Sequence, residues 1–187
     1  EPTDPYTWYY KGYVLYRLER HEEALPCLDR ALSLKSDAAS FYNQKGFCLE
    51  RLERYEEAAR CYRRSLRLSP GDLFTREYLG QALQTCGNMT EALSCFDIVL
   101  AGSPRREEAL FRRASLLSSL ERWEESAAGF ARYLTVRPES FNAWFNRGLC
   151  LRHLTRWDSA SECFERAVTL RPSSVSARHQ LEFCRRQ

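Results

Sequence analysis

The chain has 187 residues, of which 44% are hydrophobic and 28% are charged. These proportions are typical of a folded globular protein, and they exclude a disordered or collagen-like chain. Lys and Arg number 28 against 25 Asp and Glu, and the formal net charge of +3 is too small to predict nucleic-acid or membrane-surface binding. No apolar run has the length of a membrane span, and residues 1–5 lack the features of a signal peptide. The sequence does not begin with Met, so we expect it to be part of a longer chain.

Small residues and prolines recur along the chain with a fixed period. The recurring glycines, separated by 34, 34 and 68 residues, are Gly12, Gly46, Gly80 and Gly148. The recurring prolines, each 34 residues from the next, are Pro70, Pro104, Pro138 and Pro172. A period of this length is typical of proteins that stack repeated helical units.

In chain order, the period predicts a leader at 1–4, five units at 5–38, 39–72, 73–106, 107–140 and 141–174, and a capping helix at 175–187. Within each unit, apolar and small residues recur at spacings of three and four, which predicts two antiparallel helices. A short polar link joins them, as at Glu19-Arg20 in the first unit and Gly87-Asn88 in the third. Proline ends the second helix in four of the five units.

Numbered from 1 to 34, the units share a small residue at position 8 and, in four of them, proline at position 32. Position 8 holds Gly12, Gly46, Gly80, Ala114 and Gly148, and position 20 holds Ala24, Ala58, Ala92, Ser126 and Ala160. This pattern resembles the tetratricopeptide repeat over residues 5–174, with departures at Arg76 (position 4), Tyr133 (position 27) and Ser36 (position 32). The resemblance implies an all-α, right-handed superhelical solenoid of five helix-turn-helix units and a capping helix.

The cysteines follow the same period. Position 23 holds Cys27, Cys61, Cys95 and Cys163, position 10 holds Cys48, Cys150 and Cys184, and Cys86 stands apart at position 14. We interpret them as small buried hydrophobic residues rather than a metal or disulfide framework, because no Cys-x-x-Cys pair occurs. Free thiols at this density predict a reducing compartment, hence an intracellular, cytoplasmic protein.

No group of residues predicts catalysis, a metal or a cofactor. His21, His153 and His179 lie in separate units without a ligand at metal-binding spacing. Acid pairs such as Glu22-Glu23 recur at the start of second helices, where they complement the helix dipole. A phosphate-binding loop and a nucleophile elbow are also absent from the sequence, so we predict that this chain is not an enzyme.

The first helices predict a binding face. At 100° per residue, positions 2, 5, 9, 12 and 13 lie opposite the side that packs on the second helix, and the resemblance implies that they line a concave groove. The predicted groove residues are Tyr6, Tyr9, Tyr13, Tyr16, Asn43, Phe47, Phe74, Glu77, Phe111 and Phe145. Aromatic residues on this face indicate either a groove for a protein or peptide segment, or close packing of neighbouring first helices.

A subclass of the family grips the carboxylate tail of heat-shock chaperones through a lysine at position 5. Position 5 here holds Tyr9, Asn43, Glu77, Phe111 and Phe145, so that clamp is absent. Arginine pairs such as Arg63-Arg64 are interpreted as a solvated outer face, with RNA binding a minor alternative.

The sequence therefore predicts a protein-interaction module that binds a partner segment in its aromatic groove. Two alternatives stay open. One is a self-associating scaffold that forms dimers or larger assemblies through the tyrosine-rich first helix, and the other is the targeting domain of a larger enzyme. Nucleic acid and membrane insertion are not expected.

Overall fold

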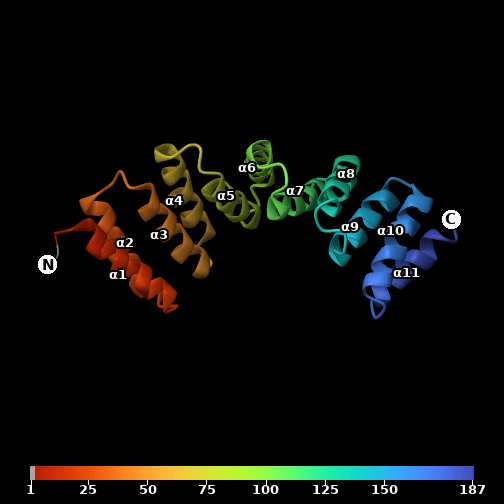
Figure 1. The fold of residues 1–187 in the computed structure, drawn as a ribbon, viewed down its shortest axis with the longest axis horizontal. Coiled ribbons are helices and arrows are strands. Elements are labelled where there is room, and N and C mark those ends of the chain that lie inside the picture. Colours follow the sequence, from red (N-terminus) through yellow and green to blue (C-terminus); the bar gives the residue numbers. More distant parts are fainter. Residues whose placement is uncertain (1–2) are drawn as a thin grey trace. The chain divides into compact units, whose positions relative to one another are not determined.

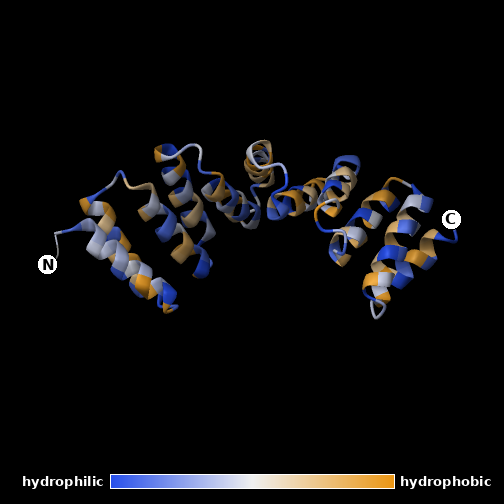
Figure 2. Ribbon diagram, viewed as in Figure 1, coloured by the Kyte–Doolittle hydropathy of each residue, from blue (hydrophilic) through white to orange (hydrophobic). Residues whose placement is uncertain are grey.

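The computed structural model describes residues 3–187, and this part of the chain is entirely helical (Figure 1). Its eleven helices are α1 (Pro5–Arg17), α2 (His21–Leu34), α3 (Ala39–Arg51), α4 (Tyr55–Leu68), α5 (Leu73–Thr85), α6 (Met89–Gly102), α7 (Glu107–Ser119), α8 (Trp123–Leu134), α9 (Phe141–His153), α10 (Trp157–Leu170) and α11 (Val175–Cys184). Each helix has a polar and an apolar side, so blue and orange alternate along the ribbons in Figure 2. The predicted all-α class is confirmed.

The chain forms two compact units, residues 1–95 and 96–187, and α6 contains the division between them. The division into five repeats and a cap stays a prediction. The first two residues of the predicted leader, 1–4, lie outside the described residues, while Asp4 caps α1 by accepting a hydrogen bond from the Thr7 N–H at 2.8 Å.

The links between paired helices share one backbone turn. In the first link, the Arg20 N–H donates to the Leu15 carbonyl at 2.9 Å, and the Glu19 N–H donates to Tyr16 at 3.0 Å. These are the two bonds of a Schellman motif, which requires a left-handed residue after the helix. That residue is Glu19, Glu53, Gly87, Glu121 or Thr155, with φ between 55° and 80°. Only Gly87 adopts this conformation without steric cost from a Cβ atom.

An arginine at the end of the link pairs with a glutamate in the first turn of the second helix. Arg20 donates two hydrogen bonds to Glu23, at 2.7 and 2.6 Å, and Arg54 does the same to Glu57, at 2.6 and 2.9 Å. These hydrogen bonds hold the pKa of Glu23 and of Glu57 below the usual range. The recurring acids therefore have a structural role at helix starts.

In the N-terminal unit, glycine at position 8 allows the two helices of a pair to approach closely. A Cβ atom at Gly46 would lie 2.8 Å from Cζ of Tyr62, whose ring is fully buried. At Gly12 it would lie 2.8 Å from Cγ of Leu28. Phe41, at position 3 of α3, is also fully buried. The core of this unit is thus built where first and second helices meet.

In the C-terminal unit, Phe130 and Phe164 are fully buried centres of one apolar cluster with Ala143 and Cys150. The Ser126 hydroxyl is buried and donates to the Ala114 carbonyl at 2.8 Å. This bond satisfies the one polar group that replaces alanine at position 20, so the substitution leaves no buried group unpaired.

The N-cap of α5 provides a test of local stability. Burial raises the pKa of the Asp72 carboxyl, but hydrogen bonds from the Thr75 side chain at 2.6 Å and from the Thr75 and Phe74 N–H groups outweigh burial and lower it. A lowered pKa means that the ionised cap stabilises the fold above pH ~4 and that this contribution is lost as the pH falls further. We expect Asp72→Ala to reduce the free energy of unfolding by about 1 kcal/mol at pH 7.

Urea denaturation at pH 7 and pH 3 measures this loss, with Asp72→Asn as the control that keeps a capping oxygen. The loss should shrink at pH 3. An equal loss at both pH values would contradict the assignment of the stabilisation to the ionised cap.

Candidate functional site

The first helices of the N-terminal unit line a pocket of about 410 Å³. Its lining comes from α1, α3 and α5, and consists of Tyr13, Tyr16, Arg17, Gln44, Phe47, Glu50, Arg51, Phe74 and Tyr78. Four of the predicted groove residues are thereby brought together, namely Tyr13, Tyr16, Phe47 and Phe74. They meet because positions 2, 9 and 12 share one side of an α-helix.

Aromatic rings form the apolar part of this pocket. The ring centroid of Tyr78 lies 4.8 Å from that of Phe47 and 4.7 Å from that of Phe74, both in edge-to-face contact. Phe74 keeps 46% of its surface exposed and Tyr13 keeps 36%. Rings held by their neighbours yet open to solvent offer a preformed contact surface for an apolar side chain.

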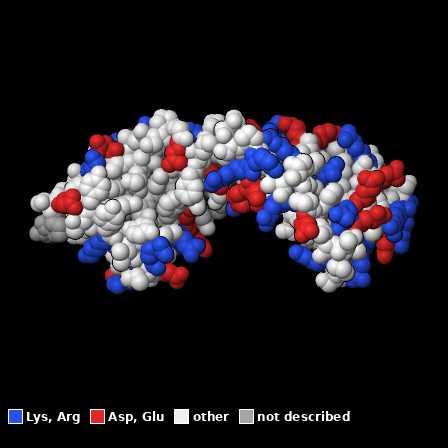
Figure 3. Space-filling model, in the orientation of Figure 1, with Lys and Arg blue, Asp and Glu red and all other residues white. Residues whose placement is uncertain are grey.

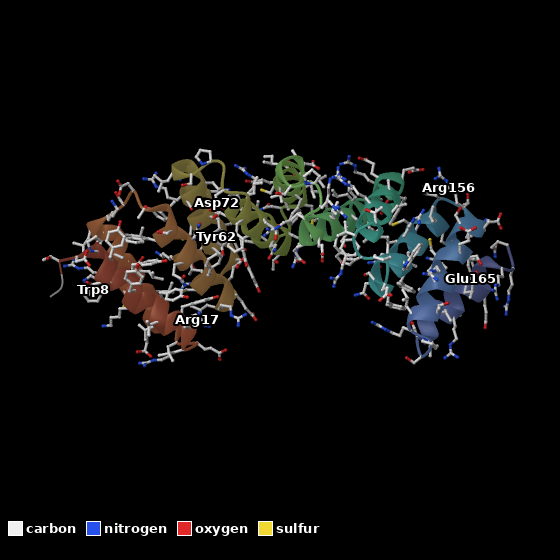
Figure 4. The ribbon with its side chains drawn as sticks, in the orientation of Figure 1. Trp8, Arg17, Tyr62, Asp72, Arg156 and Glu165 are labelled. Carbon is white, nitrogen blue, oxygen red and sulfur yellow. The ribbon has the colours of Figure 1, made fainter. Side chains whose placement is uncertain are left out.

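Polar groups stand at one end of the pocket. Arg17, at the C-terminal end of α1 (Figure 4), donates a hydrogen bond to the Tyr13 hydroxyl at 3.1 Å. Arg51 and Glu50 extend from the corresponding end of α3. Figure 3 shows few charged side chains on the visible face of the N-terminal helices. The pocket therefore combines an aromatic surface with both signs of charge at its rim.

The tyrosine cluster of α1 divides into two pairs. Tyr9 stacks on Phe41 with ring centroids 4.7 Å apart and an interplanar angle of 17°, while Tyr6 meets Phe41 edge to face at 5.5 Å. Burial raises the pKa of Tyr9. Tyr6 and Tyr9 thus pack one first helix on the next, whereas Tyr13 and Tyr16 line the pocket.

Two other predicted residues do not line the pocket. Glu77 is buried with 4% of its surface exposed. Asn43 is half-buried, and its side chain hydrogen-bonds to Asp72, which contributes to the lowered pKa of that carboxyl. Both stand at position 5. In the second and third units this position faces other residues of the same chain rather than solvent.

Phe111 and Phe145 belong to the C-terminal unit, where they pack against the core. Phe111 meets Phe130 edge to face at 5.5 Å, and Phe145 meets Phe164 at 5.7 Å. Both are half-buried against the apolar cluster of that unit. The structure therefore places them beside second-helix residues, and neither of them lines the pocket of α1, α3 and α5.

Three residues of this region were missed by the sequence analysis. Gln44 and Tyr78 stand at position 6, which lies about 40° from position 2 on a helical wheel and could have been included. Phe41 stands at position 3, which the wheel does not place on the groove face. Its burial follows from the approach of α1, a tertiary contact without a sequence signal.

Burial limits the reactivity of four of the eight thiols. All eight cysteines are free, and burial raises the pKa of Cys48, Cys61, Cys95 and Cys163 to about 11. A thiol with so high a pKa is a poor nucleophile at neutral pH. Among residues 3–187, no cluster of His, Cys, Asp and Glu could hold a metal ion, and no helix is long and apolar enough to cross a membrane.

Comparisons with known proteins identify the repeat. The family described as tetratricopeptide repeat matches residues 8–72, 79–135 and 111–175. No curated protein matches the chain. Among solved structures, YrrB, described as a TPR protein with an unusual peptide-binding site, is similar with a TM-score of 0.87, at 24% identity over 95% of this chain and 91% of that one.

MamA has the same fold at lower identity. Its structure from Desulfovibrio magneticus RS-1 matches with a TM-score of 0.83, at 19% identity over 91% of this chain and 97% of that one. Another MamA structure matches with a TM-score of 0.85, at 13% identity over 89% and 91% of the two chains. The family match extends over most of the sequence, and the helix pairs have the order that the repeat requires. The chain belongs to the tetratricopeptide-repeat family.

Proposed function

We propose that the N-terminal unit binds a peptide segment of a partner protein, with a large apolar side chain of that segment in the pocket of α1, α3 and α5. The observation that carries this proposal is the set of four rings that line the pocket of about 410 Å³. Tyr13 and Phe74 are exposed, and Phe47 and Tyr78 are half-buried. Packing alone does not require Phe74 to stay 46% exposed beside its neighbours. The similarity to YrrB, described as having a peptide-binding site, supports the same role.

The proposed role is non-catalytic and lies in a reducing compartment of the cell. Free thiols throughout the chain are compatible with reducing conditions. The chaperone-tail clamp is not part of the proposal, because no lysine stands at position 5 of any unit.

A random-peptide display library selected on the wild-type chain tests this function. The enriched peptides should carry a recurring aromatic or large aliphatic residue. We expect Tyr13→Ser and Phe74→Ser each to weaken their binding by tenfold or more, since each substitution removes an anchor surface. Fluorescence polarisation with the enriched peptides measures the affinity.

Val14→Ser is the matched control, because Val14 is a neighbouring apolar residue of α1 that is 53% exposed but does not line the pocket. Its affinity for the peptides should equal that of the wild type. Peptides that bind the wild type and both pocket variants equally well would overturn the proposed function.

One observation favours self-association as a second candidate. Tyr10 and Val14 of α1 and Leu18, the C-cap of that helix, follow one another at intervals of four, and each is more than half exposed. Such an apolar stripe fits a second copy of the chain. Light scattering over a concentration series distinguishes the two functions, because Val14→Ser would weaken an assembly while leaving peptide binding intact.

A further inference from the structure

A second pocket lies between α4 and α5, on the side of α5 away from the pocket of α1, α3 and α5. It has a volume of about 410 Å³ and is lined by Arg63, Leu66, Arg67, Arg76 and Leu79. Leu66 and Leu79 are buried and form its apolar part, and the three arginines form its polar part. Arg76 lies about 160° round the helix from both Phe74 and Tyr78. The two pockets also share no lining residue, so this arginine pocket is separate from the proposed peptide site.

Arg76 stands where the other repeats have a neutral residue. Position 4 holds Trp8, Tyr42, Arg76, Leu110 and Trp144. The Tyr42 hydroxyl donates to the Ser36 carbonyl at 3.2 Å, and Trp144 Nε1 donates to the Pro138 carbonyl at 2.8 Å. Arg76 makes the equivalent bond, from Nη2 to the Pro70 carbonyl at 2.9 Å. Neutral side chains therefore perform the structural task of this position, and the positive charge of Arg76 is not required for it.

The third repeat also lacks an arginine that, in the second and fifth repeats, lies near the ring at position 4. The guanidinium of Arg64 lies 5.9 Å from the ring centroid of Tyr42, and that of Arg166 lies 5.9 Å from the ring of Trp144. Both arginines stand at position 26, where the third repeat has Ile98. Compared with the second and fifth repeats, the third repeat has a cation in place of an aromatic ring at position 4. At position 26 it has an apolar residue in place of a cation.

The charges of the arginine pocket are only partly balanced. Arg63 donates two hydrogen bonds to the Glu91 carboxylate, at 3.1 and 2.7 Å. Among the residues that the structure describes, Arg76 bonds only to the neutral Pro70 carbonyl and Arg67 makes no ion pair. Two guanidinium groups therefore face the pocket without a carboxylate partner. Arginine favours carboxylates and phosphates, which accept paired hydrogen bonds from its planar fork.

We propose that this arginine pocket binds a carboxylate that adjoins an apolar side chain, supplied by an acidic segment of a partner protein. The unpaired charges of Arg67 and Arg76 attract the carboxylate, and the surface of Leu66 and Leu79 accepts the neighbouring apolar group. The apolar part of the pocket favours such a segment over free phosphate, which has no apolar group to place there. This site does not depend on the proposed peptide site of the first helices.

The probe is a fluorescein-labelled peptide of alternating leucine and glutamate, compared with the same peptide in which glutamine replaces glutamate. We expect the glutamate peptide to bind the wild-type chain at least tenfold more tightly than the glutamine peptide. Arg67→Gln and Arg76→Leu should each weaken binding of the glutamate peptide tenfold or more. Leucine is chosen at position 76 because Leu110 occupies the same position of the fourth repeat, and circular dichroism checks that the variant is folded.

Arg60→Gln is the matched control, since it removes one exposed charge from the same helix outside the arginine pocket. It should change the affinity by less than twofold. The proposal is overturned if the wild type does not bind the glutamate peptide, or if Arg60→Gln weakens binding as much as Arg67→Gln. It is also overturned if Phe74→Ser abolishes binding, because the peptide would then lie in the pocket of α1, α3 and α5. Displacement of the glutamate peptide by inorganic phosphate at equal concentration would overturn it as well.

Discussion

Phe41→Ala is expected to lower the free energy of unfolding by about 4 kcal/mol, because it removes a fully buried ring and leaves a cavity. The ring of Phe41 is the surface on which α1 docks, through the stacked Tyr9 at 4.7 Å and the edge-on Tyr6 at 5.5 Å. Loss of this ring therefore weakens both the core of α3 and the attachment of the first helix. Urea denaturation followed by circular dichroism measures the effect.

Phe74→Ala is the matched control, since it deletes the same atoms from α5, the first helix of the following unit, at a site that is 46% exposed. We expect it to cost less than half as much stability. Equal losses in the two variants would show that Phe41 does not anchor α1. The comparison also separates the two halves of the tyrosine cluster, because Tyr9 depends on Phe41 and Tyr13 does not.

Gly46→Ala should destabilise the chain by about 2 kcal/mol, although alanine ordinarily favours a helix over glycine. The added methyl group would lie 2.8 Å from Cζ and 2.9 Å from Cδ1 of the Tyr62 ring. That ring is fully buried and cannot move aside without displacing its neighbours Phe47 and Tyr78. The helices α3 and α4 must then separate, and the lost contacts outweigh the gain in helix propensity.

The control is Gly71→Ala, at a loop glycine whose Cβ atom would meet nothing within 4 Å. We expect this substitution to raise the free energy of unfolding by about 0.5 kcal/mol, because alanine restricts the unfolded chain. The two glycines should therefore respond with opposite signs in thermal and urea denaturation. Destabilisation of similar size at both positions would contradict the packing explanation.

The 34-residue period made the fold class predictable, because small residues at position 8 and prolines at position 32 report directly on helix contact and helix end. Part of the candidate site was predictable for the same reason, since Tyr13, Tyr16, Phe47 and Phe74 share one side of their helices. Phe41 and Glu77 were not predictable. Whether their positions face solvent depends on how closely the next helix approaches, and a helical wheel contains no information about the neighbouring helix.

The division of the four α1 tyrosines into a packed pair and a pocket-lining pair was unpredictable for the same reason, since it too depends on the neighbouring helix. All four stand on the face that the wheel assigns to the groove, yet Tyr6 and Tyr9 make ring contacts with Phe41 of α3, whereas Tyr13 and Tyr16 line a pocket with Phe47. Sequence analysis left both outcomes open for the cluster as a whole. The structure packs Tyr6 and Tyr9 on Phe41 at one end of the helix, and Tyr13 and Tyr16 line the pocket at the other.

The hydrogen bond from position 4 to the carbonyl that precedes the repeat has an evolutionary consequence. Tyr42, Arg76 and Trp144 supply a hydroxyl, a guanidinium and an indole N–H to equivalent carbonyl oxygens. Mutation can therefore exchange these side chains while each repeat stays joined to the one before it. Substitution at this one amino-acid position can in this way alter the surface charge of one repeat and leave the architecture of the array unchanged.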